Sequence, residues 1–302
     1  MIAPPTETSL TRAAQIIRHG GLVAFPTETV YGLGANALDP EAVKRIYEAK
    51  GRPFASPLIV HVADEPMARS LAADWPEIAG RLAARFWPGP LTLVVKKAPA
   101  VPDLVTAGLD SVGIRVPAHP IALALVQRAG VPIAAPSANR FMQVSPTQAD
   151  HVYATFGDTV PLVLDGGASQ VGIESTVVSL RRNPPAILRP GMITREDLES
   201  ATGVRWERET VLPQISESPG LHARHYAPHT PLFVLESGAP RPPGRGRLID
   251  MPSDPKRYAA QLYAELRKAD NEGWDWIALK RPPDTPEWEG ILDRLTRAST
   301  RP

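Results

Sequence analysis

The sequence contains no cysteine, and this absence excludes disulfides, thiolate nucleophiles and thiolate metal ligands together. Long apolar runs are also missing, because none approaches the ~20 residues that a membrane-spanning helix needs. The first residues, MIAPPTETSL, have neither the basic start nor the apolar stretch of a signal peptide, so we expect no membrane association and a cytoplasmic location. A net charge of +1 gives little overall attraction to nucleic acid.

Apolar residues make up 43% of the 302 positions, which is ordinary for a globular protein and enough for one large and one small domain. Strand-like and helix-like segments alternate through residues 1–203, which predicts one α/β domain around a large sheet. Residues 204–231 lose this periodicity and are rich in Pro, Ser, His and Glu, as is typical of a linker. Residues 232–302 predict a small C-terminal α/β domain.

The segments expected in the first domain follow from periodicity, caps and breakers. The expected helices are 9–19, one that starts after Asp39, 76–86, 119–129 and 147–156. The expected strands are 22–25, 58–62, 91–95, 112–116, 132–135, 162–164, 176–179 and 186–188.

The stretch FPTETVYGLG, residues 25–34, lies between a strand-like and a helix-like segment, as a nucleotide-binding loop does. Its glycines come last, however, and neither GxxxxGK[ST] nor the third glycine of GxGxxG is present. We expect Gly32 and Gly34 to let the backbone turn tightly into the next segment. The pattern alone does not say what the hydroxyls and the carboxylate of this stretch bind.

Histidine and serine patterns argue against two further kinds of site. The seven histidines show no HExxH or other tight ligand spacing, so we expect no zinc site, and His61 in its apolar strand has the pattern of a structural residue. Ser137 in PSAN follows a predicted strand but lacks the GxSxG of a nucleophile elbow. A serine hydroxyl that hydrogen-bonds a ligand is therefore the favoured interpretation.

Four cationic side chains lie in strands or at the ends of predicted elements, namely Lys50, Arg52, Arg115 and Arg189. Arg115 falls inside VGIRV, where an unpaired guanidinium is costly to bury, so it needs an anion. That anion is either a ligand or a carboxylate such as Glu28 or Glu174, and the pattern leaves both open. Loop hydroxyls such as Ser145 and Ser175 fit helix caps as well as ligands. Together these residues suggest a cavity for a small polyanion such as a nucleotide.

Ordered motifs are specific enough to indicate a family. The chain contains FPTETVYGLG, AKGRP, PLIVHV, WPGPLTLV, VGIRVPAHP, PIAAPSAN, SPT, DGG, GIESTVV and LRPG. In this order they closely resemble the YrdC-type threonylcarbamoyl-AMP synthases over residues 8–200. HARHYAPHTPL, residues 222–232, resembles the linker of the longer members, and residues 288–299 resemble the last helix of their C-terminal domain. The resemblance implies a large twisted mixed sheet with flanking helices around a cavity.

The resemblance also implies a reaction. Such enzymes convert L-threonine, bicarbonate and ATP into L-threonylcarbamoyladenylate and pyrophosphate, with Mg²⁺ accompanying the ATP. A downstream tRNA threonylcarbamoyl transferase then modifies the adenosine beside the anticodon. Stable tRNA binding by this chain is therefore not required, and its metal ligands are left unassigned.

Site residues follow from the same resemblance, position by position. The positions that match the threonine site are Thr29, His61, Arg115, Ala135 and Ser175. The positions that match the ATP or adenylate site are Arg52, Ser56, Ser111, Ser137, Asn139, Ser145, Arg189 and Tyr226. Lys50 and Arg52 are expected to stabilise phosphate charge, with no enzyme nucleophile. Arg115 would bind the amino-acid carboxylate. Glu28 is left with three alternatives, which are to orient the amine, to help hold the metal or to pair with an arginine.

Two departures from the family and two competing functions accompany this reading. Residues 140–144, RFMQV, are bulkier than the small residues often found there, and the C-terminal segment is short. An RNA-binding module is one alternative, although the chain is nearly neutral and such a module should show several clustered surface cations. A carbamoyl-transfer or hydrolytic protein on the same domain is the other. Thr29, Arg115 and Ser175 with the HYAPH motif favour the synthase, and we expect the linker to close over the site.

Overall fold

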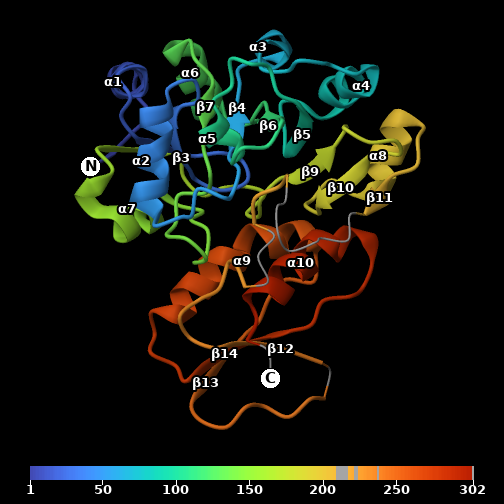
Figure 1. Cartoon of the computed structure of the whole chain (residues 1–302). Coiled ribbons are helices and arrows are strands. Elements are labelled where there is room, and N and C mark those ends of the chain that lie inside the picture. The colour runs from blue at the N-terminus through green and yellow to red at the C-terminus, as the bar shows by residue number, and fades with distance from the viewer. Residues whose placement is uncertain (209–216, 221–223, 237, 301–302) are drawn as a thin grey trace.

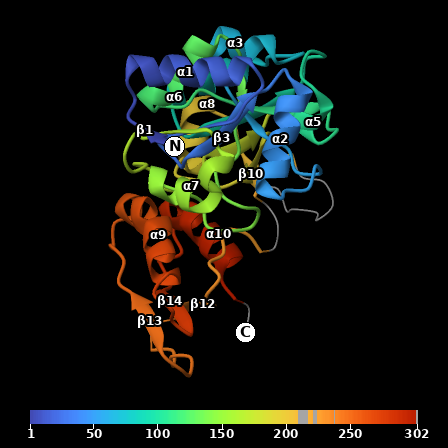
Figure 2. The same cartoon turned by 90° about the vertical axis from the view of Figure 1, so that its left-hand side faces the viewer.

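The computed structural model describes residues 1–208, 217–220, 224–236 and 238–300. Within these ranges the chain forms a large unit built on an 11-stranded sheet and a smaller unit built on a 3-stranded sheet (Figure 1). Helices α9 (Pro255–Asp270) and α10 (Glu289–Ala298) of the smaller unit lie between its sheet and the large unit (Figure 2). No helix of the described ranges is long and apolar enough to cross a bilayer.

The large sheet is mixed, because β4 and β6 run parallel whereas β5 and β6 run antiparallel. Its strands stand in the spatial order β1 (Ile2–Ala3), β8 (Leu162–Leu164), β2 (Val23–Phe25), β3 (Gly32–Asn36), β7 (Ile133–Ala134), β4 (Ile59–His61), β6 (Ser111–Arg115), β5 (Leu91–Lys96), β9 (Thr176–Ser179), β10 (Ala186–Arg189) and β11 (Glu207–Arg208). The expected α/β class with a large mixed sheet is confirmed.

Helices cover both faces of this sheet. They are α1 (Glu7–Arg18), α2 (Pro40–Lys50), α3 (Glu65–Ser70), α4 (Glu77–Phe86), α5 (Asp103–Thr106), α6 (Pro120–Ala129), α7 (Ala149–Phe156) and α8 (Arg195–Thr202). Alternation along β2 divides the core, because Val23 and Phe25 pack with α1 and α6 whereas Ala24 joins the cluster built with α2 and α7. The smaller sheet is parallel and has the order β12 (Leu232–Leu235), β14 (Trp276–Lys280), β13 (Gly246–Ile249).

Local signals set the ends of α2. Asp39 accepts hydrogen bonds from the backbone N–H groups of Glu41 and Ala42, and Pro40 occupies the first turn. Gly51 ends the helix with a left-handed φ of 61°. The helix therefore delivers Lys50 and the following Arg52 to the edge of the core.

Residues 32–36 form a strand, which the sequence pattern did not predict. β3 pairs antiparallel with β2, with Val23 opposite Gly34 and Phe25 opposite Gly32. A Cβ on Gly34 would lie 2.6 Å from Cε1 of Phe25 and 2.7 Å from Cγ2 of Ile133. The expectation that these glycines turn the chain is therefore wrong. Glycine at position 34 instead lets neighbouring side chains pack against the strand, a role that β-propensity does not reveal.

Candidate active site

A cavity that opens to solvent lies in the large unit beside the β2–β3 hairpin. Its lining comes from the loop after β2, from strands β3, β4, β6 and β10, from the segments that follow α2 and β7 and the one that precedes β9, and from Pro219, Gly220, His225 and Tyr226. The expected site residues that line it are Thr29, Arg52, His61, Arg115, Ala135, Ser137, Ser175, Arg189 and Tyr226. The expected site residues outside the lining are Lys50, Ser56, Ser111, Asn139 and Ser145.

Arg115, at the end of β6, pairs with the loop that follows β2. Its Nη2 donates to Oε1 of Glu28 at 2.6 Å, and its Nη1 donates to Oγ1 of Thr29 at 3.0 Å. Its Nε donates to the carbonyl of Gly89 at 3.1 Å. The other oxygen of Glu28 accepts from the backbone N–H of Ala118 at 3.0 Å. The open question about the protein partner of Arg115 is thus answered by Glu28, which pairs with an arginine.

His61, at the end of β4, is held neutral. Burial, and then the nearby Arg115 charge, lower its pKa to about 3. Its Nδ1 has no hydrogen-bond partner among the described residues, and its ring meets Phe25 edge-on at 6.0 Å between centroids. The imidazole therefore offers the cavity wall an uncharged ring with one unused polar atom.

Arg52 and Arg189 are buried cations, and neither forms an ion pair with a carboxylate among the described residues. Arg52 Nη2 donates to the hydroxyl of Ser56 at 2.5 Å, and its Nε has no partner within the described part of the chain. Burial first, and then the charge of Arg189, lower the pKa of Arg52 to about 10. Both guanidiniums remain charged at neutral pH and favour an anionic ligand in the cavity.

Lys50 supports the loop after β7 and does not face the cavity. Its Nζ donates to the carbonyls of Ser137 and Asn139, each at 2.5 Å. The Asn139 side chain accepts from the Ser137 hydroxyl at 2.6 Å and donates to two carbonyls of its own loop. Lys50 and Asn139 therefore shape the segment that presents Ser137, and the sequence pattern could not separate this role from direct phosphate contact.

Three expected ligand serines lie outside the lining. Ser56 accepts from Arg52, and Ser145 donates to Oε1 of Glu174 at 2.6 Å. Ser111 is buried at the start of β6, opposite Lys96 of β5. Ser56 and Ser145 thus each contact a side chain of the lining, Arg52 or Glu174, a difference that motif matching does not resolve.

The segment expected to be a linker contributes to the cavity wall. Pro219, Gly220, His225 and Tyr226 line the cavity, and Arg189 Nη1 donates to the Pro219 carbonyl at 3.0 Å. Tyr226 has a left-handed φ of 60°, is buried, and its hydroxyl has no partner among the described residues. A strained, buried residue with an unused hydroxyl in a cavity is typical of a functional position.

Sequence reasoning missed several residues of the cavity lining. Thr27 shares the β2–β3 loop with Thr29, and its Oγ1 lies 2.8 Å from the Thr29 hydroxyl. Glu174 had been considered only as a partner for Arg115, although it lines the cavity itself. Glu174 is the sequence neighbour of Ser175, and His225 is the sequence neighbour of Tyr226. Adjacency to these matched residues was the signal that could have identified both as cavity residues.

Comparisons with known proteins identify the family of the chain. A family model described as telomere recombination matches residues 15–191, and one described as the C-terminal domain of threonylcarbamoyl-AMP synthase matches residues 193–300. The threonylcarbamoyl-AMP synthase of Pyrococcus abyssi is 48% identical, over 97% of this chain and 94% of its own. That of Bacillus subtilis is 41% identical, over 97% of this chain and 93% of its own.

A solved structure resembles the whole chain. The crystal structure of P. abyssi Sua5 complexed with L-threonine matches with a TM-score of 0.93 and 39% identity, over 99% of this chain and 97% of that one. Both units are included in this match, so the resemblance extends beyond the cavity to the smaller unit. The chain belongs to the threonylcarbamoyl-AMP synthase family.

Proposed function

We propose that this chain joins L-threonine, bicarbonate and ATP into L-threonylcarbamoyladenylate and releases pyrophosphate. Family membership supports the reaction, and one observation links it to this chain. Arg52 and Arg189, both without a carboxylate partner among the described residues, share a cavity with the Arg115–Thr29 pair. Such a cavity suits a nucleotide and an amino acid together.

The threonine site in this proposal comprises Thr29, His61, Arg115, Ala135 and Ser175, all of which line the cavity. A guanidinium carries five N–H groups, and three hydrogen bonds from Arg115 go to Gly89, Thr29 and Glu28. The remaining N–H groups would bind the carboxylate of threonine. Glu28 thereby holds the guanidinium in place, and neutral His61 adds no competing charge.

The nucleotide site comprises Arg52, Ser137, Arg189 and Tyr226 in the lining, together with Ser56, Asn139 and Ser145, which hydrogen-bond to lining residues, and with Ser111. Lys50 would act on the phosphates indirectly, through the loop whose carbonyls it holds. Arg52 and Arg189 would stabilise the charge that develops on the phosphates.

The chemistry needs no enzyme nucleophile. The amine of threonine and bicarbonate form a carbamate and lose water. A carbamate oxygen then attacks the α-phosphorus of ATP, and the bond from that phosphorus to the bridging oxygen of pyrophosphate breaks. The chain contributes by positioning the reactants, by stabilising charge and by keeping water away from the labile product.

Magnesium is proposed as the companion of ATP. Among the described residues, no group of three or more His, Cys, Asp or Glu side chains is placed to hold a metal ion. Mg²⁺ usually keeps several waters and binds through substrate phosphates with one or two carboxylates, so this donor set fits a metal that enters with the nucleotide. When bound there, magnesium neutralises triphosphate charge.

The product would pass to a tRNA threonylcarbamoyl transferase, which modifies the adenosine next to the anticodon. We place this work in the cytoplasm, where ATP, bicarbonate and tRNA occur together. The segment that carries Tyr226 would close over bound adenylate and open for release. Removing the residues after Gly203 without loss of synthase activity would argue against that closure.

Pyrophosphate release by the purified chain tests the function. Release should require ATP, threonine and bicarbonate together and should be much weaker with other amino acids. Release that ignores threonine, or that continues without bicarbonate, would refute the proposed reaction.

A further inference from the structure

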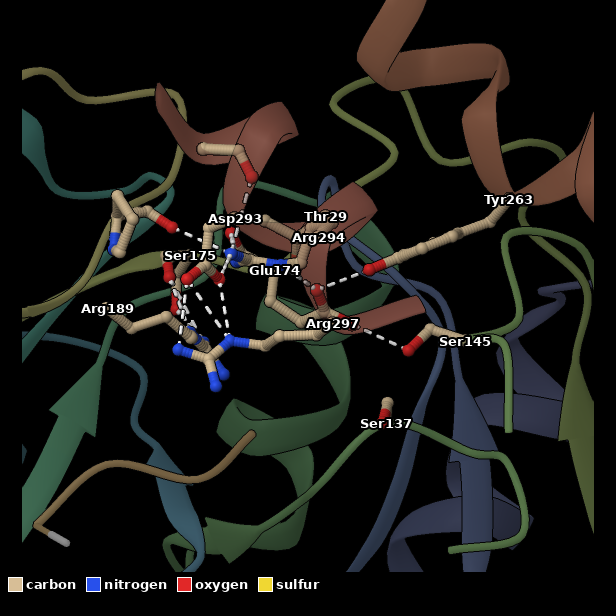
Figure 3. Close-up of polar contacts among 12 residues, drawn as sticks. Thr29, Ser137, Ser145, Glu174, Ser175, Arg189, Tyr263, Asp293, Arg294 and Arg297 are labelled. Atoms are coloured by element: carbon tan, nitrogen blue, oxygen red, sulfur yellow. Dashed lines mark hydrogen bonds and ion pairs between the residues drawn. The ribbon is translucent and has the colours of Figure 1, made fainter. Parts of the chain in front are cut away.

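Glu174 lines the cavity, yet its carboxylate is held largely from the smaller unit. Its Oε1 accepts from the Ser145 hydroxyl at 2.6 Å. Its Oε2 accepts from the Tyr263 hydroxyl of α9 and from Nε of Arg294 of α10, each at 2.9 Å (Figure 3). The negative charge of Glu174, next to the proposed nucleotide site, is thus neutralised by Arg294 of α10 in the smaller unit.

Arg294 contacts three segments that supply cavity residues, although it is not part of the lining itself. It is fully buried, and its Nη2 donates to the Glu174 carbonyl at 3.2 Å, beside Ser175. Its Nη1 donates to the Pro190 carbonyl at 2.9 Å, beside Arg189. Its guanidinium carbon lies 5.3 Å from the ring centroid of Tyr226.

Tyr226 is also packed against the smaller unit. Its ring stacks on that of Tyr263 with centroids 5.9 Å apart and an interplanar angle of 26°. Arg189 in turn donates from Nη2 to the carbonyl and the hydroxyl of Ser175, at 3.0 and 3.2 Å. The segments that present Ser175, Arg189 and Tyr226 therefore all contact the guanidinium of Arg294.

We propose that Arg294 is a positioning residue for the adenylate half of the active site. It holds Glu174 as a neutralised carboxylate beside the phosphates and fixes the ring of Tyr226. This inference rests on the proposed synthase function. Without Arg294, an unpaired carboxylate would face the anionic nucleotide, and the Tyr226 ring would lose its cationic neighbour.

A purely structural ion pair is the alternative, because buried pairs are often no more than part of the packing. The two roles differ in which substrate is affected. Arg294 has no hydrogen bond to Thr29 or Arg115, and it reaches Ser175 of the threonine site only through the backbone carbonyl of Glu174. A positioning role therefore predicts weaker ATP binding with less change for threonine. A structural role predicts a loss of folded protein that affects both substrates equally.

The experiment compares four variants of the full chain by steady-state kinetics and thermal unfolding. Arg294→Met should raise the KM for ATP about tenfold or more, with a much smaller change in the KM for threonine. Arg294→Met combined with Glu174→Gln should recover most of the ATP affinity, because the unpaired charge is gone. The matched control is Arg208→Met, which breaks a more exposed ion pair to α10, 2.8 Å from Glu289, and should leave both KM values unchanged.

Tyr263→Phe keeps the proposal testable if Arg294→Met does not fold. It removes only the hydroxyl that donates to Glu174 and should raise the KM for ATP about threefold. Equal KM values for ATP in Tyr263→Phe and the unaltered chain would overturn the proposal. The proposal would also be overturned if the double variant had a KM for ATP as high as that of Arg294→Met. An unaltered chain without threonine-dependent pyrophosphate release would instead refute the proposed function.

Discussion

Arg115 and Glu28 form a buried ion pair at the wall of the cavity, with Nη2 and Oε1 2.6 Å apart. The pair joins β6 to the β2–β3 loop and places the guanidinium next to the Thr29 hydroxyl. Because the carboxylate takes one N–H group, the cation stays available to a second anion while its position is fixed.

Replacing Arg115 by Ala should impair threonine use far more than ATP use. The variant removes the proposed carboxylate ligand and leaves Glu28 buried without its cation, so we expect the KM for threonine to rise about 30-fold or more, about 2 kcal/mol. Initial rates of pyrophosphate release at varied threonine and ATP give both constants. Glu28→Gln, which keeps an acceptor of the same size, should have a smaller effect. Equal changes for the two substrates would contradict the role of Arg115.

Lys50→Met should weaken the fold more than it weakens nucleotide contact. The Ser137 and Asn139 carbonyls lose a buried donor, which should lower the free energy of unfolding by about 1–3 kcal/mol in urea titrations. Arg52→Met is the comparison, because it should mainly raise the KM for ATP. Unchanged stability together with lost activity in Lys50→Met would favour direct phosphate contact by Lys50.

Acid should destabilise the protein partly through His61. Its pKa is lowered from 6.5 to about 3 in the folded state, so the unfolded state binds more protons between these values and stability is lost as the pH falls through that range. Between pH 7 and pH 5 this contributes a loss of about 2 kcal/mol. His61→Gln should lose correspondingly less stability in urea titrations at the two pH values. His151, whose pKa is lowered to about 4 mainly by burial, acts in the same direction and remains in both proteins.

Gly34→Ala should destabilise the β2–β3 hairpin. The added Cβ would lie within 2.7 Å of Phe25 and Ile133, which should cost about 1–3 kcal/mol of unfolding free energy. Gly80→Ala is the matched control, because its Cβ would meet nothing closer than 3.9 Å inside α4. That control should gain roughly 0.5–1 kcal/mol from helix propensity. A tolerated Gly34→Ala would show that the close contact is relieved by small shifts.

Prediction from sequence was accurate where local rules act. The cap at Asp39, the proline after it and Gly51 set α2 without tertiary help. Prediction was inaccurate where tertiary packing decides the structure, as at β3. The glycines of β3 have the pattern of a turn but lie in a strand, where Phe25 and Ile133 fill the space beside Gly34. The roles assigned to individual site residues stay predictions, although most of those residues line one cavity.

The sequence by itself determined the family, the α/β class and the residue types that gather at the site, because motifs, periodicity and caps are properties of neighbouring positions. Only the tertiary structure decided which carboxylate meets which cation. Arg115 pairs with Glu28 and Glu174 with Arg294, and the latter pair spans 120 positions between the two units. Charge pairing depends on distances of a few ångströms after packing, and no pattern along the chain encodes those distances.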